Sequence, residues 1–497
     1  MKKIFSTILI GLFAIHACDK DNLSLSNPNE LTPDTYFTSD AQLTASVNAI
    51  YTNLQSRGYY ARRYFFTNDL MSQECFGLGS LAADLRQYID HSFDPSNPGF
   101  QFFWENSFQG IAQANFVINN QENFENMTEA VVNKRLGEAH YLRAHYYFEL
   151  VSRFGDVPLL VEIVTSPEGL PRTASEEIYQ FILSDLTEAI RLLPEKDVAD
   201  AANLGRATRG TAQALKGMVH LFREEYTEAS TEFQNVINGP YSLVDDFNDN
   251  FEEESEHNDE SIFEIQFNSA WGGSGAWSIN GTGVAEVTFR GQEYGFSAWR
   301  NVIPSQELLE EFESDDPRLG YTFYAPGDTY GSNNEFTVEA FVTIPDDLPS
   351  WRKYQRYYKQ ENEDTNSGVN FRFMRLANVI LMQAEALAMS NNLPGAVDLL
   401  NQIRSRPSVN MPLYGTAEMD SRGYPVSTQE QVINAIRHEK MVELAGEQVR
   451  YRDIIRWGMG PDVIPNFQTG KHELWPIPQT EIDANPEMTN NDQNPGY

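Results

Sequence analysis

The chain has 497 residues, of which 41% are hydrophobic and 12% aromatic, and its formal net charge is −35. That apolar content is typical of a folded globular protein and excludes a disordered chain. The negative charge argues against nucleic-acid binding, because phosphate contacts dominate such affinity, and it disfavours polyanionic ligands. With only two cysteines, Cys18 and Cys75, we expect no disulfide framework.

The N-terminus has the pattern of an export signal. Two lysines precede an apolar run over residues 4–15 that is too short to span a bilayer. The run ends at Ala17-Cys18, and a small residue before a cysteine at this depth resembles a bacterial lipobox. We therefore expect residues 1–17 to be a lipoprotein signal peptide, Cys18 to carry the membrane anchor, and residues 18–35 to form its tether. An ordinary secretory signal with a chance cysteine is the alternative.

Helical periodicity begins after the tether. Ser39 and Asp40 can cap a helix with an apolar face that ends near Leu54. Residues 68–100 are rich in Gly, Asp and Asn with few periodic runs, which predicts loops. The helical period returns over Trp104–Asn119.

The clearest helix lies around residues 134–160. Asn126 can cap its start, with Glu129 completing a capping box. A repeat of apolar and aromatic residues at three- and four-residue steps then defines its face, and Pro158 forbids continuation. Arg143 lies on that face, and we expect Glu138 or Glu149 to pair with it locally.

Paired helices are predicted on both sides of a long interruption. Residues 173–176 form a second capping box, followed by an amphipathic helix that ends at Pro194. Residues 208–222 and 226–237 predict a helical hairpin similar to a tetratricopeptide repeat, and the pattern returns over 376–389 and 396–404. These pairs can pack together if the chain between them loops out.

The interruption, residues 241–372, loses the helical period and gains Gly, Tyr, Trp and short alternating runs such as 261–267. We predict a single domain over residues 36–497, mainly α, in which a helix-pair scaffold at about 36–240 and 373–497 carries this loop and short-strand insertion. The scaffold supplies stability and leaves the insertion free to carry function.

Residues 268–300 contain the strongest candidate for a binding site. Trp271 and Trp277 lie in a run of glycine and serine that offers little bulk to bury them. A flat indole face suits the C–H face of a sugar ring, while amide and guanidinium groups can bond its hydroxyls. The expected polar contacts of this site are Asn268, Asn280, Arg290 and Tyr294. Both tryptophans could instead pack against the scaffold.

Further ligand contacts are predicted with weaker support. Trp299 follows the same run, and Asp84, Arg86 and Tyr88 lie in the expected loop at 68–100. The stretch 351–359 alternates basic and aromatic residues as single-strand nucleic-acid sites do. In an exported acidic chain it more simply predicts a structural strand.

Metal and catalytic sites gain little support. The acidic tract from Asp246 begins like a calcium-binding loop, but Phe251 and His257 replace the required glycine and glutamate, so we predict no metal. Glu439 and Glu443, one turn apart on a predicted helix over 431–457, could form a glycosidase pair. Alternating carboxylates and arginines more simply predict an ion-pair network along that helix. No cofactor motif is present in the sequence.

Several segments together resemble the SusD/RagB family of Bacteroidetes surface lipoproteins. These are Cys18, Arg143–Pro158, Gly205–Arg209, Arg375–Ala386, Glu439–Arg450 and the ending Pro476–Tyr497. The chain has Gly446-Glu447-Gln448 where many members have Phe-Glu-Gly, which we expect to alter packing and not the class.

The resemblance implies a fold on tetratricopeptide-like helix pairs, lipid anchoring at the outer cell surface and no hydrolysis. It also implies capture of a polysaccharide or oligosaccharide, which is handed to a SusC-like TonB-dependent transporter. The negative charge favours a neutral glycan such as a β-glucan. The alternatives are a peptide- or protein-binding lid of that transporter and a glycosidase.

Overall fold

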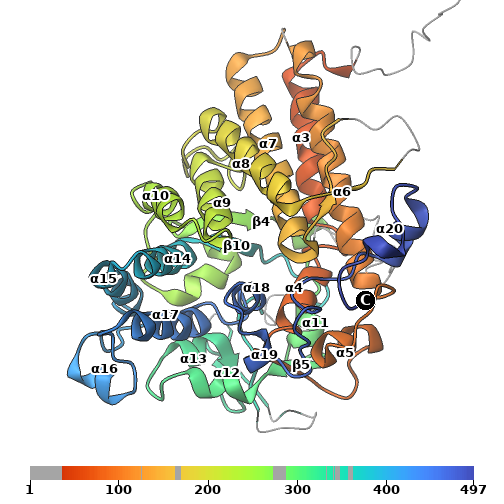
Figure 1. The fold of residues 1–497 in the computed structure, drawn as a ribbon. Helices are drawn as coiled ribbons and strands as arrows, with labels where there is room; N and C mark the ends of the chain where they lie inside the picture. The colour runs from red at the N-terminus through yellow and green to blue at the C-terminus, as the bar shows by residue number, and fades with distance from the viewer. Residues whose placement is uncertain are drawn as a thin grey trace, which may run out of the picture.

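The fold is built mainly from helices, with short two-stranded sheets between them (Figure 1). The computed structural model describes residues 36–124, 126–162, 169–271, 287–331, 333–339, 341, 348–355 and 362–497, with only the backbone described at Trp271. Within these ranges, no helix combines the length and apolar character that a membrane crossing needs.

Long helices pack side by side and form the scaffold (Figure 1). The first four are α3 (Asp40–Leu54), α6 (Pro98–Ile118), α7 (Glu129–Phe154) and α8 (Ser175–Leu192). The next five are α9 (Arg209–Phe222), α10 (Tyr226–Ile237), α14 (Leu376–Met389), α15 (Leu393–Arg404) and α17 (Gln429–Glu443). Helix α10 packs directly on α14 across the insertion. The mainly helical, tetratricopeptide-like prediction is therefore confirmed.

Helix starts agree with the sequence only in part. Ser39 caps α3, and Thr208 caps α9 in a capping box with Thr211. The expected cap at Asn126 is wrong, because α7 begins after Thr128, whose hydroxyl donates to Asp40 Oδ2 at 2.7 Å. The expected capping box at residues 173–176 is also wrong, since α8 begins at Ser175 without a side-chain cap.

Two predicted boundaries are wrong. The expected loop at 68–100 contains the end of α4 (Arg63–Asp69), β1 (Cys75–Gly77), α5 (Ala83–Asp90) and the start of α6. Helices this short present too few residues for a period to register. The expected helix over 431–457 is two helices, α17 and α18 (Arg450–Arg456), because the backbone between them adopts positive φ at Gly446 and Gln448.

The insertion contributes strands that pair across the molecule. Strand β4 (Ser261–Ile265) runs antiparallel to β10 (Phe371–Arg375), which leads directly into α14, with register shifts between Arg372 and Arg375. The other antiparallel pairs are β1 with β5 (Val302–Pro304), β2 (Val157–Pro158) with β3 (Arg172–Thr173), β6 (Phe323–Tyr324) with β9 (Ser350–Trp351), and β7 (Thr329–Tyr330) with β8 (Phe336–Thr337).

Short helices complete the described chain. Helices α11 (Arg290–Tyr294), α12 (Gln306–Glu311) and α13 (Arg318–Thr322) belong to the insertion. Helices α16 (Ala417–Ser421), α19 (Gly460–Val463) and α20 (Gln479–Ala484) follow in the C-terminal part. Single 3₁₀ turns lie at Gln121–Phe124, Phe247–Phe251, Glu253–Ser255, Ser269–Trp271 and Asn490–Asp492.

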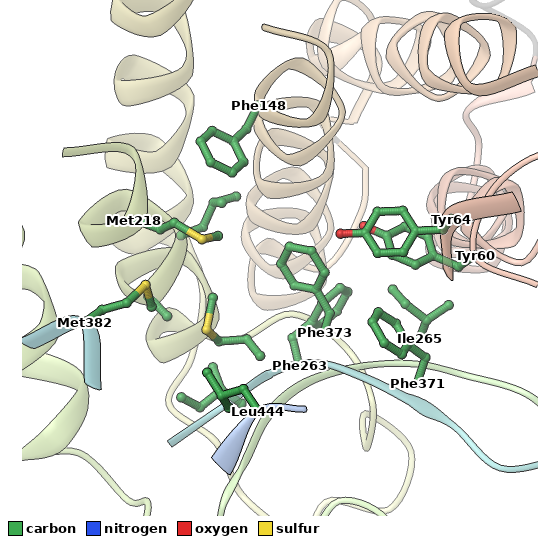
Figure 2. Close-up of a cluster of buried hydrophobic side chains, with 14 of the residues drawn as sticks. Tyr60, Tyr64, Phe148, Met218, Phe263, Ile265, Phe371, Phe373, Met382 and Leu444 are labelled. Atoms are coloured by element: carbon green, nitrogen blue, oxygen red, sulfur yellow. The ribbon is translucent and has the colours of Figure 1, made fainter. Parts of the chain in front are cut away.

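The core is aromatic where the β4–β10 pair meets α4, α7, α9 and α14. Figure 2 shows Phe263, Ile265, Phe371 and Phe373 of the two strands reaching toward Tyr60 and Tyr64 on one side and Met218 and Met382 on the other. This cluster is continuous with buried residues from Phe37 to Met488. Scaffold and insertion therefore share one hydrophobic core.

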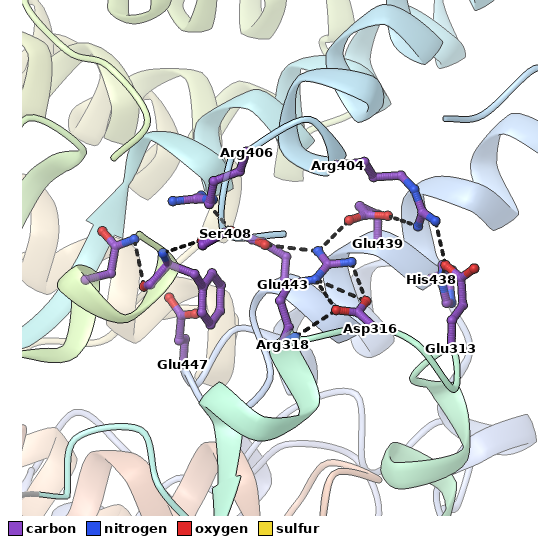
Figure 3. A network of polar contacts seen from close by, with 12 residues as sticks. Glu313, Asp316, Arg318, Arg404, Arg406, Ser408, His438, Glu439, Glu443 and Glu447 are labelled. Atoms are coloured by element: carbon purple, nitrogen blue, oxygen red, sulfur yellow. Dashed lines mark hydrogen bonds and ion pairs between the residues drawn. The ribbon is translucent and has the colours of Figure 1, made fainter. Parts of the chain in front are cut away.

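A buried ion-pair network joins the insertion to α17 (Figure 3). Arg318 at the start of α13 donates to Glu439 at 2.5 Å and to Glu443 at 3.0 Å, and it pairs with Asp316. Arg375, Arg404 and Arg406 supply further positive charge to the same glutamates. Glutamates 439 and 443 are fully buried.

The network bears on two predictions, the ion pairs along one helix and the glycosidase pair of Glu439 and Glu443. Glu447 pairs with Arg375 and Lys353, so the ion pairs cross between elements more than they follow one helix. Asp453 and Arg456 do pair along α18, at 2.7 Å. Burial opposes ionisation of Glu443, but Arg406, Arg375 and Arg318 hold its pKa below the usual range. A carboxylate kept charged and enclosed in this way cannot serve as the proton donor of a glycosidase pair.

Candidate functional site

An open cavity of about 290 Å³ lies where the first part of the scaffold meets the insertion. The scaffold contributes the turn that leads into α4, the start of α5 and Phe102 of α6, while the insertion contributes Phe289, α11 and the segment that leads into β5. The lining residues are Arg57, Gly58, Arg62, Arg63, Ser80, Ala82, Asp84, Phe102, Phe289, Gln292, Glu293, Trp299 and Asn301.

Gly58 allows the turn before α4 to approach α6 closely. A Cβ at Gly58 would lie 2.4 Å from Asn106 Nδ2 and 3.0 Å from Phe102 Cβ, so no larger residue fits without a shift. The insertion is joined to the same turn because the Phe289 amide donates to the Ala61 carbonyl at 3.2 Å. The Arg57 guanidinium lies over the Phe289 ring, 5.3 Å from its centroid. These contacts join the two walls of the cavity to each other.

Charged groups of both signs line the cavity. Arg63 pairs with Asp84 at 2.6 Å, and Arg62 lies 3.8 Å from Glu293. Asn301 also donates to Glu293, at 2.7 Å. Burial raises the pKa of Glu293, and burial together with the neighbouring Arg63 lowers the pKa of Arg62. These donors and acceptors are fixed in place, as recognition of sugar hydroxyls requires.

The cavity also has an aromatic rim. Trp299 is 49% exposed, although large apolar side chains in this fold are mostly enclosed. Its backbone amide donates to the Gln292 carbonyl at 2.9 Å, which ties the rim to α11. Phe102 lines the cavity as a partly buried ring and Phe289 as a buried one. A flat exposed ring beside fixed polar groups can hold an amphipathic ring such as a sugar.

The predicted contact residues lie in different places, and only some of them line the cavity. Trp299 and Asp84 line the cavity. Arg290, Tyr294 and Tyr88 are buried behind its walls and do not line it, because each side chain is enclosed in the core. Asn268 is exposed but lies outside the cavity lining, and its side chain accepts from the Ala270 amide.

Arg86 also does not line the cavity, since its guanidinium donates to the Leu78 carbonyl. Trp277 and Asn280 lie outside the described residues. The backbone of Trp271 closes a 3₁₀ turn, and its side chain is not described. Contact of these three residues with a ligand remains a prediction.

Sequence reasoning missed most of the charged lining. Arg57, Arg62 and Arg63 come from a run of basic and aromatic residues, RGYYARRYFF, between residues 57 and 66. The mixture of basic and aromatic residues in this run was the local signal that could have pointed to these arginines. Gln292 and Glu293 carry no comparable sign, because they are recruited by the fold of α11.

One group of possible metal ligands lies elsewhere among the described residues. Atoms of Glu256, His257 and Glu264 approach within 4.8 Å of one another. Arg372 already supplies positive charge there, with its guanidinium 3.7 Å from Glu256 and 3.6 Å from Glu264. Since a guanidinium takes the place that a cation would need, we assign no metal to this group.

The stacked helix pairs place this protein in a tetratricopeptide-like class of helical proteins. An irregular insertion meets these helices at an open cavity lined by aromatic rings and charged groups. Two family models match the chain, one described as the SusD family over residues 259–470 and one as "Starch-binding associating with outer membrane" over residues 21–221. The chain belongs to the SusD/RagB family.

Individual relatives agree with this assignment. SusD-like protein P2 of Formosa agariphila is 28% identical over the full length of both chains. The starch-binding protein SusD of Bacteroides thetaiotaomicron is 23% identical, with 88% of this chain and 86% of that protein covered. A solved structure described as a laminarin-binding SusD-like protein is 26% identical, with a TM-score of 0.76 and coverage of 92% of this chain and 99% of the other.

Proposed function

We propose that the protein binds a glycan at the junction cavity without cleaving it. The observation that carries this proposal is the combination of the half-exposed Trp299 with fixed donors and acceptors around one open cavity. Names of relatives support it, since one binds starch and another laminarin. The indole would receive the C–H face of one sugar ring, and Arg62, Glu293 and Asn301 would bond its hydroxyls.

The chemistry of the lining supports a neutral glycan, and the name of one similar structure favours a β-glucan. Three guanidinium groups face two carboxylates, and Asp84 and Glu293 each lie beside an arginine, so local charges largely cancel. The whole chain is strongly negative, which disfavours a polyuronate. Laminarin, bound by the similar structure, is the first glucan to test.

Trp271, Trp277, Asn268 and Asn280 remain part of the proposed glycan surface. The segment that carries them leaves the described chain after Trp271 and rejoins it at Val287, two residues before Phe289 of the cavity wall.

Binding would be the first step of uptake. We propose that Cys18 carries lipid in the outer membrane, and that the protein faces the cell surface and passes glycan to a SusC-like TonB-dependent transporter. The lipobox-like sequence and the family description "associating with outer membrane" support this placement. The remaining alternative is a peptide- or protein-binding lid of the same transporter with no glycan affinity.

Calorimetric titration with laminarin oligosaccharides tests the proposal. Trp299→Ala should weaken binding about tenfold or more, because loss of an aromatic anchor costs about 1.4 kcal/mol or more. Its melting temperature should stay unchanged, since half of the side chain is already in solvent. Phe336→Ala is the control, because Phe336 is exposed to a similar 44% and does not line the cavity.

The outcomes separate the three functions. Equal affinity of Trp299→Ala and wild type would contradict the site, and no binding across a panel of glycans would favour the peptide- or protein-binding lid. Release of reducing sugar that disappears in Glu293→Gln would establish a glycosidase instead. We expect the glycan to be recovered intact.

A further inference from the structure

The segment between α17 and α18 contains a non-glycine residue in an unfavourable backbone conformation. Gln448 has a φ of 60°, and Gly446 two residues earlier has a φ of 69°. The glycine is explained by packing, because a Cβ there would lie 2.5 Å from the Trp351 ring. Gln448 has no such freedom, since L side chains rarely adopt this region. Its side chain must therefore compensate for the conformation.

Gln448 is 1% exposed and bridges two oppositely charged groups. Its Nε2 donates to Asp69 Oδ2 at 2.8 Å, and its Oε1 accepts from Arg290 Nη1 at 3.1 Å. A side chain that carries both a donor and an acceptor, as an amide does, can make both bonds at once. An amide at this position therefore links α4, which contains Asp69, to α11, which contains Arg290.

Contacts that do not pass through the Gln448 side chain hold both ends of α11 as well, among them a direct Arg290–Asp69 ion pair at 3.6 Å. Arg290 at its start also donates to the Gly446 carbonyl at 2.7 Å, and Tyr294 at its end donates to Asp69 Oδ2 at 2.9 Å. The Arg290 guanidinium lies over the Tyr294 ring, 4.8 Å from its centroid. A helix of five residues cannot hold its own conformation, since helix nucleation is costly. These buried contacts therefore set where α11 lies.

The opposite side of α11 forms part of the cavity wall. Gln292 and Glu293 line the cavity, and the Gln292 carbonyl accepts from the Trp299 amide. A displacement of α11 would consequently move a cavity carboxylate and the exposed indole together. Arg290 and Tyr294 act on the site from behind through this connection.

We propose that Gln448 is a positioning residue for the glycan site, which holds α11 and hence Glu293 and Trp299 in the geometry that binds sugar. The inference rests on the proposed function. It adds that affinity depends on a buried amide outside the cavity.

Gln448→Gly separates positioning from general stability. Glycine relieves the positive φ and so offsets part of the cost of the lost hydrogen bonds to Asp69 and Arg290, and we expect only a small change in melting temperature. Loss of the amide releases α11, so affinity for laminarin oligosaccharides should fall at least fivefold. Hydrogen exchange of the backbone amides from Gly291 to Trp299 should become faster. Asn391→Gly is the matched control, because Asn391 is exposed and has a φ of 63°.

An affinity within twofold of wild type would overturn the proposal, as would a loss of affinity that merely follows a lower melting temperature. If wild type binds no glycan, the proposed function fails, and the exchange rates of α11 alone decide whether Gln448 positions it.

Discussion

His145 lies on α7 with no exposed surface, and its Nε2 is 2.9 Å from the Tyr60 hydroxyl. Its ring packs against Phe373, with 4.6 Å between the ring centroids. Burial lowers the pKa of His145 to about 4, so the folded chain holds a neutral imidazole at neutral pH. In the unfolded chain the ring titrates near its usual value of about 6.5.

The unfolded state therefore binds this proton more readily than the folded state. The resulting stability is present in full above about pH 6.5 and is lost as the pH falls toward 4. We expect the difference in free energy of unfolding between wild type and His145→Gln to narrow by about 2–3 kcal/mol from pH 7 to pH 4.5. Urea unfolding of both proteins at both pH values measures this difference, in which the contributions of the other titrating groups cancel. A constant difference would contradict the lowered pKa.

Individual partners were the hardest feature to predict from the sequence. The need of Arg143 for a partner was predictable, but the predicted glutamates on its own helix are wrong. Asp185 of α8 accepts from both Nε and Nη2, each at 2.7 Å. Trp299 could be predicted because an aromatic ring in a polar run stands out locally. Arg57 and Arg62 gain their meaning only when Phe289 and Glu293 lie opposite them, which no local pattern encodes.

At the scale of elements, α17 is held by charge as well as by apolar packing. Arg375 at the end of β10 is 1% exposed and donates to Glu260, Glu443 and Glu447 at 2.7 to 2.8 Å. Three carboxylates that belong to the insertion and the C-terminal segment thus share one guanidinium. The four groups lie in a medium of low dielectric, where an unpaired charge is costly.

We expect Arg375→Met to lower the free energy of unfolding by about 3–5 kcal/mol, because it leaves buried carboxylates without their counter-charge. Arg191→Met is the control, since Arg191 pairs with Glu188 on an exposed face of α8 and should change little. Denaturant titration compares the two variants. A loss as small as that of Arg191→Met would mean that Arg406, Arg318 and Lys353 suffice to neutralise these carboxylates.

Elements with a sustained period were predictable, and the hairpin α9–α10 and the helices α14 and α15 lie close to the predicted ranges. Breaks between helices were not predictable, because the spacing of apolar residues does not show where the backbone φ becomes positive. The gap between α17 and α18 follows from the packing of Trp351 on Gly446, two residues that are far apart in sequence. The short α5 and α11 were missed because each is stabilised by its surroundings.

At the scale of the whole molecule, the division of labour between scaffold and insertion is less strict than predicted. The insertion was expected to carry most of the site, with weaker candidates at Asp84, Arg86 and Tyr88 of the scaffold. The cavity takes a larger share from the scaffold, namely Arg57, Gly58, Arg62, Arg63, Ser80, Ala82, Asp84 and Phe102. The prediction could not foresee this, since a site at a junction has no signature in either part alone. Changes in the scaffold near α4 and α5 should therefore alter glycan selectivity as well as stability.

The proposed lipid anchor can be tested on the complete chain. Cys18→Ser should move the protein from the membrane fraction to the soluble fraction, because each buried CH₂ of an acyl chain contributes about 0.8 kcal/mol to membrane binding. Immunoblots of separated fractions, after a high-salt wash that removes proteins held by charge, measure the shift. Full retention of the variant would point to another mode of attachment, such as the transporter alone. Its glycan affinity in solution should match that of wild type.

The contact between α10 and α14 has a consequence for how the chain acquires its shape. The two helices lie against each other, yet the whole insertion is synthesised between them. Until α14 is available to pack, the face of α10 that it will cover remains exposed to solvent. Chains truncated before Leu376 should therefore aggregate or be degraded after export. The full-length chain can form its hydrophobic core once α14 has packed on α10.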